Sequence, residues 1–252
     1  MLAKVAKTLR GPVYDRRLRR LASAVLPLLY AGDNVVCPCC DGRFRRFIRR
    51  YGSDALCPKC LSLKRHRLLW LYLRDRTEIR SRDISLLHIS PEEALERRLR
   101  SLPRLQYVSA DLSPSSIAMV RADITNLPFA EGTFDAVICN HVLEHVPDDR
   151  RAMGELYRVL KPGGRAYMMH PVSTSNEHTD EDPTVTDKAE RRRRFGQDDH
   201  VRRYGRDFIQ RNQEVGFEVR VEEYSQTLSD DAVAKYVLGD DRIYVCGKST
   251  TP

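Results

Sequence analysis

Residues 121–148 read RADITNLPFAEGTFDAVICNHVLEHVPD, and residues 156–172 read LYRVLKPGGRAYMMHPV. The apolar run at 134–139 predicts a buried strand, because strands that are covered on both faces are apolar throughout. Residues 148–160 predict a helix, which ends at the KPGG sequence because proline and glycine stop helices. Residues 165–170 predict the next strand. A strand, a helix and a second strand in this order form one unit of a parallel sheet.

The same alternation continues on both sides of this unit. Further strands are predicted at 84–89, 106–110, 121–124, 217–224 and 242–247, and further helices at 62–80, 91–100 and 207–214. The last two strands are expected to pair as an antiparallel hairpin through the turn at 239–241. The fold class is therefore α/β, with a doubly wound, Rossmann-like sheet of seven mostly parallel strands. The polar residues 173–206 are expected to form an inserted lid.

The charge of the chain, +8 overall, is concentrated in its first third. Residues 1–80 contain 19 Lys and Arg against 6 Asp and Glu, whereas the remainder is mildly acidic. A basic surface can bind nucleic acid, an anionic headgroup or a phosphate-bearing substrate, and it can also be a plain solvated surface. Residues 14–30 predict an amphipathic helix that docks on the protein or, as an alternative, lies on a membrane surface.

The targeting signals in the sequence are few. A run of about 18 apolar residues, which a transmembrane helix needs, is not found, so no transmembrane segment is expected. The first residues are basic but lack the apolar core and cleavage site of a signal peptide. These features favour the cytoplasm, where closely spaced cysteines bind metal more often than they form disulfides.

Two cysteine pairs have the spacing C-x2-C-x16-C-x2-C, and they are Cys37, Cys40, Cys57 and Cys60. This spacing predicts a tetrahedral Zn²⁺ site, with each pair on one tight turn. Four thiolates close the coordination sphere, so the zinc is expected to be structural, stabilising a segment too short to fold alone. Cys39 could replace Cys40, although the two-residue gap favours Cys40. Cys139 and Cys246 lie in apolar strands and are expected to be core residues.

Asp111 ends the predicted strand in YVSADL, at 107–112, and a carboxylate there can accept hydrogen bonds from both hydroxyls of a ribose. Together with the two stretches quoted first, this sequence resembles the class I S-adenosylmethionine (SAM)-dependent methyltransferases, of the type 11-like group, over about 84–247. The cysteine pairs ahead of LHISPE, at 87–92, and the late stretch 181–208 resemble a bacterial group of zinc-ribbon methyltransferases. The resemblance implies SAM as the cofactor and places 181–208 in the lid.

The resemblance also implies roles for single residues. Asp111 would bind the ribose, Asp123 would accept a hydrogen bond from the adenine amino group, and the Ile124 N–H would meet the ring. One departure is the loop after the first strand, 88–93, which has no glycine where the family is glycine-rich, so that Ser90 would contact the methionine end. The implied cofactor residues are His88, Ser90, Asp111, Leu112, Asp123, Ile124, Asn140 and His141.

A general base is needed if the methyl acceptor is a hydroxyl, and histidine suits this role because its pKa is near neutrality. His200 in the lid is the first candidate, with Asp199 as its orienting partner, and His170 is the second. Glu144 and His145 are expected to be structural residues that hold the following helix.

The chain is therefore expected to contain a basic helical segment (1–34), a zinc-ribbon module (35–62) and a methyltransferase domain (63–252). The favoured function is methyl transfer to a small molecule, such as a hydroxyl of a sugar or secondary metabolite. An RNA methyltransferase is the less favoured alternative, in which the arginines and aromatic residues at 43–51 bind phosphate and stack on bases. A non-catalytic SAM-binding protein is the third, suggested by the glycine-free loop.

Overall fold

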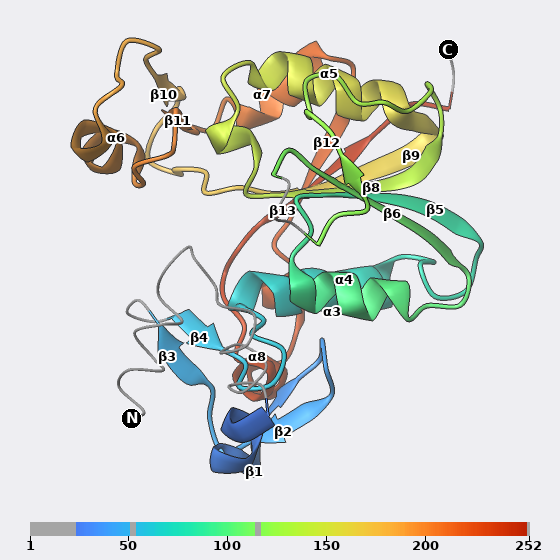
Figure 1. Cartoon of the computed structure of the whole chain (residues 1–252), viewed down its shortest axis with the longest axis vertical. Coiled ribbons are helices and arrows are strands. Elements are labelled where there is room, and N and C mark those ends of the chain that lie inside the picture. Colours follow the sequence, from blue (N-terminus) through green and yellow to red (C-terminus); the bar gives the residue numbers. More distant parts are fainter. Residues whose placement is uncertain (1–23, 51–53, 114–116, 251–252) are drawn as a thin grey trace.

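The computed structural model describes residues 24–50, 54–113 and 117–250 (Figure 1). The described residues include only the last turns, at 24–29, of the helix predicted at 14–30. The rest of that helix, and with it most of the basic segment, lies outside the described residues. Within the described residues, no helix is long and apolar enough to span a membrane.

A seven-stranded sheet forms the centre of the molecule, in the order β12-β13-β9-β8-β5-β6-β7. Its strands are β5 (Ile84–Ile89), β6 (Leu105–Asp111), β7 (Val120–Arg121), β8 (Phe134–Asn140), β9 (Leu160–Met169), β12 (Glu218–Glu222) and β13 (Ile243–Gly247). Strands β5 to β9 are parallel, and β13 runs antiparallel to both of its neighbours. The predicted doubly wound Rossmann-like sheet, including its antiparallel end, is confirmed.

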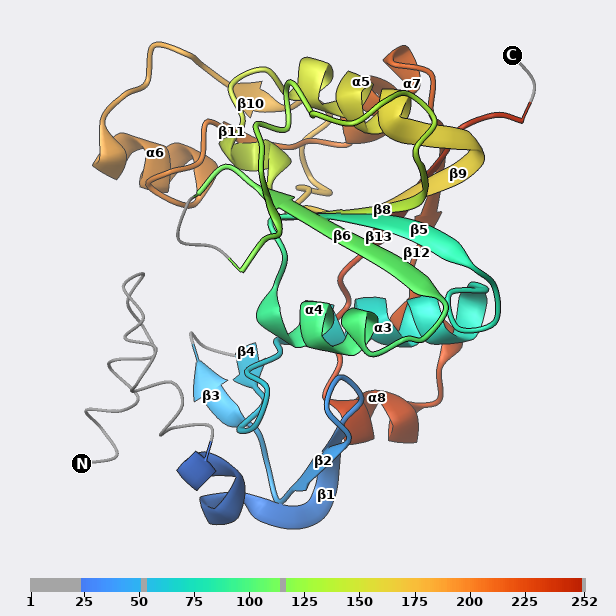
Figure 2. The same ribbon diagram turned by 45° about the vertical axis from the view of Figure 1, so that its right-hand side comes forward.

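Helices cover both faces of the sheet (Figures 1 and 2). One face carries α3 (Lys64–Arg76) and α4 (Glu93–Arg100), and the other carries α5 (Asp149–Val159) and α7 (Phe208–Glu214). Each helix buries an apolar side against the strands, so two core layers form. Burial of this apolar surface is the main contribution to the stability of such a domain.

Four short strands pair as two hairpins below this sheet in Figure 1. They are β1 (Ala31–Cys37), β2 (Gly42–Phe44), β3 (Ile48–Arg50) and β4 (Asp54–Leu56), and we call residues 31–62 the cysteine module. The buried Arg67 of α3 donates hydrogen bonds to the carbonyl of Ala55 in this module (3.0 Å) and to the carbonyls of Tyr236 (2.8 Å) and Val237 (2.7 Å). The module and one face of the sheet therefore share a continuous core.

Two predicted features differ from the structure. The strand predicted at 121–124 ends at Arg121, because the Asp123 carboxylate accepts hydrogen bonds from the N–H and hydroxyl of Thr125 (both 2.8 Å) and forms a turn instead. The prediction that a short turn at 239–241 joins the last two strands is wrong. Strands β12 and β13 do pair, but between them lie η2 (Tyr224–Thr227) and α8 (Asp230–Tyr236). Ser229 caps α8 by accepting from the N–H of Ala232, a start signal that the turn interpretation overlooked.

The inserted residues 173–206, which we call the lid segment, have structure of their own. Strands β10 (Asp180–Glu181) and β11 (Arg202–Arg203) pair antiparallel, and α6 (Lys188–Phe195) lies between them. Asp187 caps the start of α6, and Gly196, with φ of 99°, ends it. The segment forms the left end of the upper layer in Figure 1.

Candidate functional site

A cavity of about 770 Å³ lies at the carboxyl edge of the parallel strands, where the chain leaves β5, β6 and β8. We call it the edge cavity. Six of the predicted cofactor residues line it, namely Ser90, Asp111, Leu112, Asp123, Ile124 and His141. Its volume falls within the usual range of small-molecule sites. Another cavity, of about 790 Å³, is lined by residues of the opposite edge, such as Asp75, Asp135 and Gly163, and by none of the predicted site residues.

Asp111 is held at the rim of the edge cavity by two hydrogen bonds. The hydroxyl of Ser90 donates to its Oδ2 (3.2 Å), and the N–H of Ser113 donates to its Oδ1 (2.8 Å). A carboxylate has about four acceptor positions, so two remain once these donors from the described residues are counted. The side chain is thus fixed in place and can still accept hydrogen bonds from a bound diol.

His88 and Asn140, the other two predicted cofactor residues, are not among the residues that line the edge cavity. Both are buried and surround the carboxylate of Glu92. His88 Nε2 lies 2.8 Å from Glu92 Oε2, and the Asn140 amide donates to Oε1 (3.3 Å). Burial by itself raises the pKa of Glu92, but the hydrogen bond from His88 and the charge of His66 lower it to about 2. Glu92 is therefore an ionised and only partly exposed carboxylate next to the site, which the sequence analysis had missed.

A buried carboxylate, Glu144, joins two histidines, of which His141 lines the edge cavity. His170 Nδ1 lies 2.9 Å from Glu144 Oε2, and His141 Nδ1 lies 3.2 Å from Oε1. Burial opposes ionisation of Glu144, but the hydrogen bonds from His141 and His170 outweigh it and hold the pKa well below its ordinary value. The charged carboxylate fixes the orientation of both imidazoles.

The predicted pairing of His200 with Asp199 is not found. His200 is buried, and its Nδ1 lies 3.0 Å from the carbonyl oxygen of Phe195. The exposed Asp199 carboxylate lies 3.5 Å from His145 Nδ1 instead. Consecutive side chains diverge in the turn after α6, so Asp199 faces the cavity while His200 packs inward. Burial lowers the pKa of His200 and also that of His170.

A smaller cavity of about 410 Å³ adjoins this cluster, and we call it the side cavity. His141 and His170 line one part of it, and its lining includes four charged residues, namely Glu223, Asp240, Asp241 and Arg242. His141 lines both cavities and is about a quarter exposed. Asp240 and Asp241 lie on the connection that the sequence had assigned to a hairpin turn, so their approach to His141 was not foreseen.

Arg202 of the lid segment fixes the loop that borders the edge cavity. It is buried and donates to the carbonyls of Leu143 (2.8 Å) and Pro147 (2.8 Å), and also to that of Val146. Its Nε donates to Glu181 of β10 (2.9 Å). The lid segment is therefore docked on η1 (Leu143–His145) by a buried charged group.

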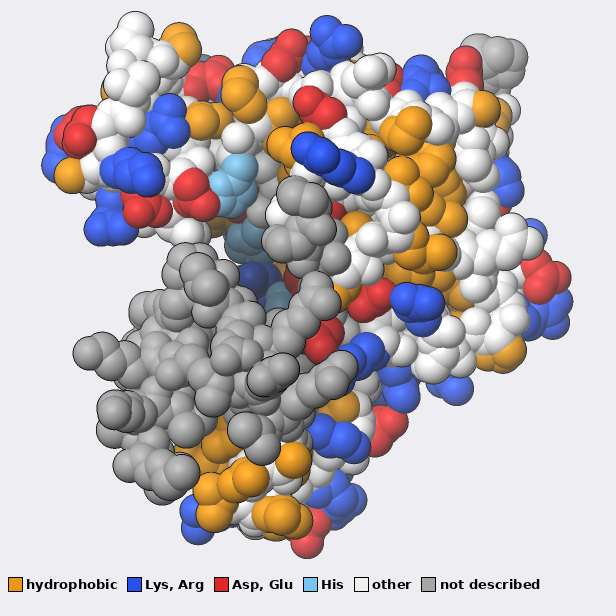
Figure 3. Space-filling model, viewed as in Figure 1, with side chains coloured by type: hydrophobic (Ala, Val, Ile, Leu, Met, Phe, Trp, Pro, Cys, Tyr) orange, Lys and Arg blue, Asp and Glu red, His pale blue; other side chains and the backbone are white. Residues whose placement is uncertain are grey.

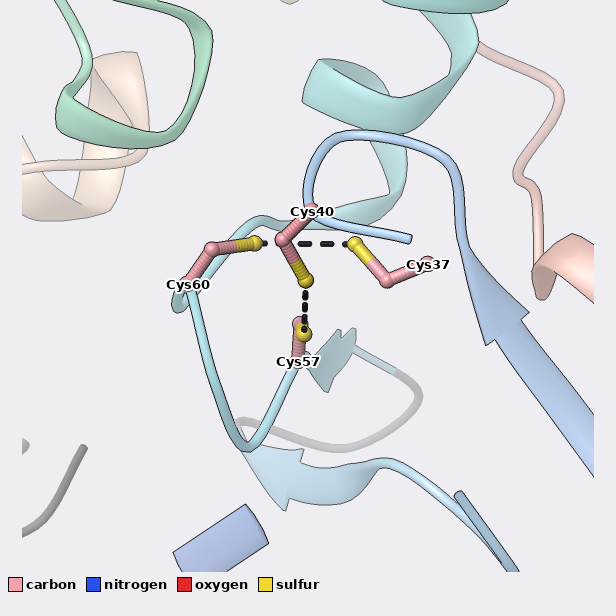
Figure 4. A group of neighbouring side chains, drawn as sticks. All are labelled: Cys37, Cys40, Cys57 and Cys60. Carbon is pink, nitrogen blue, oxygen red and sulfur yellow. Dashed lines mark hydrogen bonds between the residues drawn. The ribbon is translucent and has the colours of Figure 1, made fainter. Parts of the chain in front are cut away.

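The four predicted zinc ligands converge on one point in the cysteine module (Figure 4). Their ligand atoms all lie within 4.8 Å of one another, with 3.5 Å between the sulfurs of Cys37 and Cys60 and 3.7 Å between those of Cys40 and Cys57. Four sulfurs in a tetrahedron around one zinc ion are about 3.8 Å apart. Cys39 turns away toward the carbonyl of His66, and burial raises the pKa of its thiol well above the ordinary value.

The surface proposed for RNA binding exposes its described arginine side chains but not its described aromatic rings. Phe44 and Phe47 are buried against each other in the module core, with 6.0 Å between ring centroids. Arg43 pairs with Asp33 at 2.6 Å, and Arg45 packs near the ring of Tyr30. Tyr51 lies outside the described residues. Of the aromatic residues proposed for base stacking, the two that the structure describes are thus core residues.

The sequence around this site is similar to that of known methyltransferases. Residues 86–168 match the family model described as a methyltransferase domain. A ubiquinone/menaquinone biosynthesis C-methyltransferase of Desulfotalea psychrophila is 37% identical over 78 residues, 26% of this chain and 32% of that protein. A demethylmenaquinone methyltransferase of Thermus thermophilus is 37% identical over 81 residues, 27% of this chain and 37% of that protein. The chain thus matches only about a third of the length of these relatives.

Among solved structures, the [4+2]-cyclase SpnF covers 91% of this chain and 94% of its own, with a TM-score of 0.53 and 17% sequence identity. At this identity the similarity concerns the fold alone. The structural likeness extends over nearly the whole chain, whereas the sequence likeness is concentrated in the strands and turns around the edge cavity.

Proposed function

We propose, on the premise that this chain belongs to the class I SAM-dependent methyltransferases, that it transfers a methyl group from SAM to a small polar acceptor. The observation that carries the proposal is the position of His141, which lines the edge cavity and the side cavity at once. A donor in the first and an acceptor in the second would meet beside this histidine. Bringing the two reactants together in a fixed geometry is the main way in which a protein accelerates such a transfer.

The edge cavity fits the cofactor by the chemistry of its lining. Asp111, with two acceptor positions remaining, would accept hydrogen bonds from the ribose hydroxyls. Asp123 and the Ile124 N–H would meet the adenine, and Ser90 would lie at the methionine end. When bound, SAM supplies an electrophilic methyl group, so the chain itself needs only to align the acceptor, exclude water and accept a proton.

The side cavity supports a polar acceptor such as a hydroxyl-bearing sugar or secondary metabolite. Its volume of about 410 Å³ is too small for a polynucleotide, and its lining includes the carboxylates of Glu223, Asp240 and Asp241. Two of the relatives are named for quinone substrates, which makes a quinone the competing acceptor. The charged lining disfavours a ring with a long apolar tail, because charged groups are costly to desolvate against hydrocarbon.

His141 is our first candidate for the general base, since Glu144 holds it beside both cavities. His170 also lines the side cavity and remains the second candidate. His200 and Asp199 belong to the lid segment and do not line the side cavity, and we assign them no proton transfer.

A structural zinc ion in the cysteine module is part of the proposal. The sulfur separations of 3.5 and 3.7 Å support it, because they match the edges of a tetrahedral thiolate site. In this assignment Cys37, Cys40, Cys57 and Cys60 are the ligands, and Cys39 is a packing residue. Closely spaced thiols of this kind also favour a cytoplasmic location.

The experiment measures binding and turnover separately. Isothermal titration should detect SAM and its demethylated product binding to the wild type, with at least about tenfold weaker binding to Asp111→Ala, since two charge-assisted hydrogen bonds are lost. Asp83→Ala, at the opposite edge of the sheet, serves as the matched control and should bind as the wild type does.

The acceptor is then sought with labelled SAM against hydroxylated small molecules and a demethylated quinone. His141→Gln should keep SAM affinity within about threefold and lower turnover about 100-fold. Folded wild-type protein that takes up neither SAM nor its product would refute the enzyme proposal. Turnover of the quinone alone would keep the activity and reject the polar acceptor.

A further inference from the structure

We propose that Glu144, His145 and His200 form a binding site for a divalent transition-metal ion, separate from the four cysteines. One ligand atom from each of these residues lies within 4.8 Å of the other two. Glu144 and His145 come from η1, and His200 comes from the turn that follows α6 in the lid segment. The proposal does not depend on methyl transfer, because it rests on this group of side chains alone.

His200 has the arrangement expected of a metal ligand. Its Nδ1 lies 3.0 Å from the carbonyl oxygen of Phe195, so this nitrogen carries the proton and the lone pair remains on Nε2. His200 is 3% exposed, and its Nε2 has no hydrogen-bond partner among the described residues. Buried polar atoms are nearly always paired, so an unpaired ring nitrogen calls for a ligand. Metal-binding histidines commonly have their other ring nitrogen fixed by a carbonyl in this way.

Glu144 supplies a fixed negative charge at the centre of the group. Its side chain is 1% exposed, and the imidazoles of His141 and His170 lie within 3.2 and 2.9 Å of its two oxygens. These two histidines would act as supports that orient the carboxylate toward a bound ion. Carboxylates that ligate metals are usually held by outer partners of this kind.

His145 is the third residue of the group, and its partly exposed side chain can rotate. Its side chain is 34% exposed, and its ring packs edge to face on that of His200, with 4.7 Å between the centroids. Ligand atoms that share one ion at about 2.1 Å lie roughly 3 to 3.5 Å apart. A small rotation of the exposed His145 would bring its nitrogen to that distance. Asp199, 3.5 Å from His145 Nδ1, could add an oxygen.

The donor set points to the chemical class of the ion. Two imidazoles and one carboxylate suit Zn²⁺, Co²⁺, Fe²⁺ or Mn²⁺ and leave coordination positions open. His145 and Asp199 line the edge cavity, so these positions would face it. Histidine side chains gather at the hollow that Figure 3 shows on this side of the molecule. A bound ion would also link the lid segment to η1 and stabilise their contact.

The test adds Co²⁺ to full-length protein whose cysteine module already holds zinc. We expect one further equivalent to bind, with weak visible d–d absorption and none of the intense sulfur-to-cobalt charge transfer of a thiolate site. His200→Gln and Glu144→Gln should each weaken cobalt binding at least 30-fold. His66→Gln removes another buried histidine, outside the group, and should bind cobalt as the wild type does.

Circular dichroism checks that each variant is folded. If neither buried variant folds, the test depends on His145→Ala. This residue is partly exposed, and its loss should also weaken cobalt binding at least tenfold. Wild-type protein that binds no cobalt beyond the zinc equivalent, or binds it with thiolate charge transfer, would overturn the proposal. So would unchanged cobalt affinity in His145→Ala.

Discussion

Ser90 and His141, which follow β5 and β8 at the edge cavity, have φ values of 48° and 51°. This left-handed region is unfavourable for side chains other than glycine, at a cost of about 1–2 kcal/mol per residue. Hydrogen bonds offset the cost, because the N–H of Ser90 donates to the Ala110 carbonyl (2.8 Å) and that of His141 donates to the Met169 carbonyl (2.8 Å). The glycine-free loop after the first strand therefore still makes the sharp turn, with a serine in the strained position.

Replacement of Ser90 tests this account. Ser90→Gly and Ser90→Ala both lose the hydroxyl that donates to Asp111, but only glycine relieves the backbone strain. Urea unfolding should therefore find Ser90→Gly more stable than Ser90→Ala by about 1 kcal/mol. Equal stabilities of the two variants would show that the turn is not strained.

Acid pH should destabilise the protein through His66. Burial lowers the pKa of His66 to about 3 in the folded chain, against 6.5 when it is exposed. Between these values the unfolded state binds the additional proton, so the free energy of unfolding falls as the pH drops below about 6.5. The contribution of this one group is at most about 1.4 kcal/mol per pH unit.

The measurement compares urea unfolding at pH 7.5 and 5.5. His66→Asn should lose less stability over this interval than the wild type, because asparagine does not titrate. Glu92 does not affect this comparison. Its pKa is about 2 in the folded chain, against 4.5 when it is exposed, so the stability it contributes is lost only as the pH falls from about 4.5 to about 2. An identical loss in both proteins would contradict the assignment.

At the scale of elements, the lid segment is the part whose docking matters most. Asp149 of α5 accepts hydrogen bonds from Tyr204 (2.8 Å) and from Arg211 of α7 (3.1 Å). Arg211 also donates to Glu181 of β10 (2.6 Å). Together with Arg202, these buried charges bind β10 and β11 to the domain. The polar composition of the segment therefore reflects an internal ion-pair network as well as a solvated surface.

Adjacent arginines of β11 provide a matched pair of variants. Arg202→Met should lower the free energy of unfolding by about 2–4 kcal/mol, because three carbonyls and Glu181 lose a buried charged donor. Arg203→Met, on the exposed side of the same strand, should change it by less than about 0.5 kcal/mol. Limited proteolysis should cut the lid segment faster in Arg202→Met alone. Similar behaviour of the two variants would mean that Arg202 does not anchor the segment.

For the whole molecule, the decisive feature is that the cysteine module and the sheet domain share one core. Trp70, the sole tryptophan, is buried on α3 at their junction, and Arg98 of α4 lies over its ring at 5.0 Å. Arg98 also donates to Asp41 in the first cysteine turn (2.9 Å). Loss of the module fold should therefore disturb the sheet domain, and Trp70 fluorescence should report it.

Zinc removal is the corresponding test. Cys40→Ser should lose the metal and lower the midpoint of a single thermal transition followed through Trp70, because zinc binding and folding are coupled. By elemental analysis, Cys39→Ala should contain one more zinc per chain than Cys40→Ser. Two separate transitions would contradict a shared core, and equal zinc contents of the two variants would contradict this ligand set.

Several features could be predicted from the sequence because they depend on local patterns. The apolar runs at 84–89 and 134–139 predict central strands from their composition. The cysteine spacing brings four thiols together through two tight turns. Asp111 and Asp123 lie at the edge cavity because the carboxyl ends of parallel strands share one edge. The place of Asp111 follows from chain direction and periodicity, whereas that of Asp123 was implied by the family resemblance.

Only the tertiary structure decided which side chains meet across long distances in the chain. Asp199 faces His145 rather than its neighbour His200, and the carboxylates of Glu92 and Glu144 are each paired with a histidine from another element. Arg202, to which the sequence analysis assigned no role, became the anchor of the lid segment. The energy of a buried charge depends on the partners that enclose it, and those partners are fixed only when the whole core has formed.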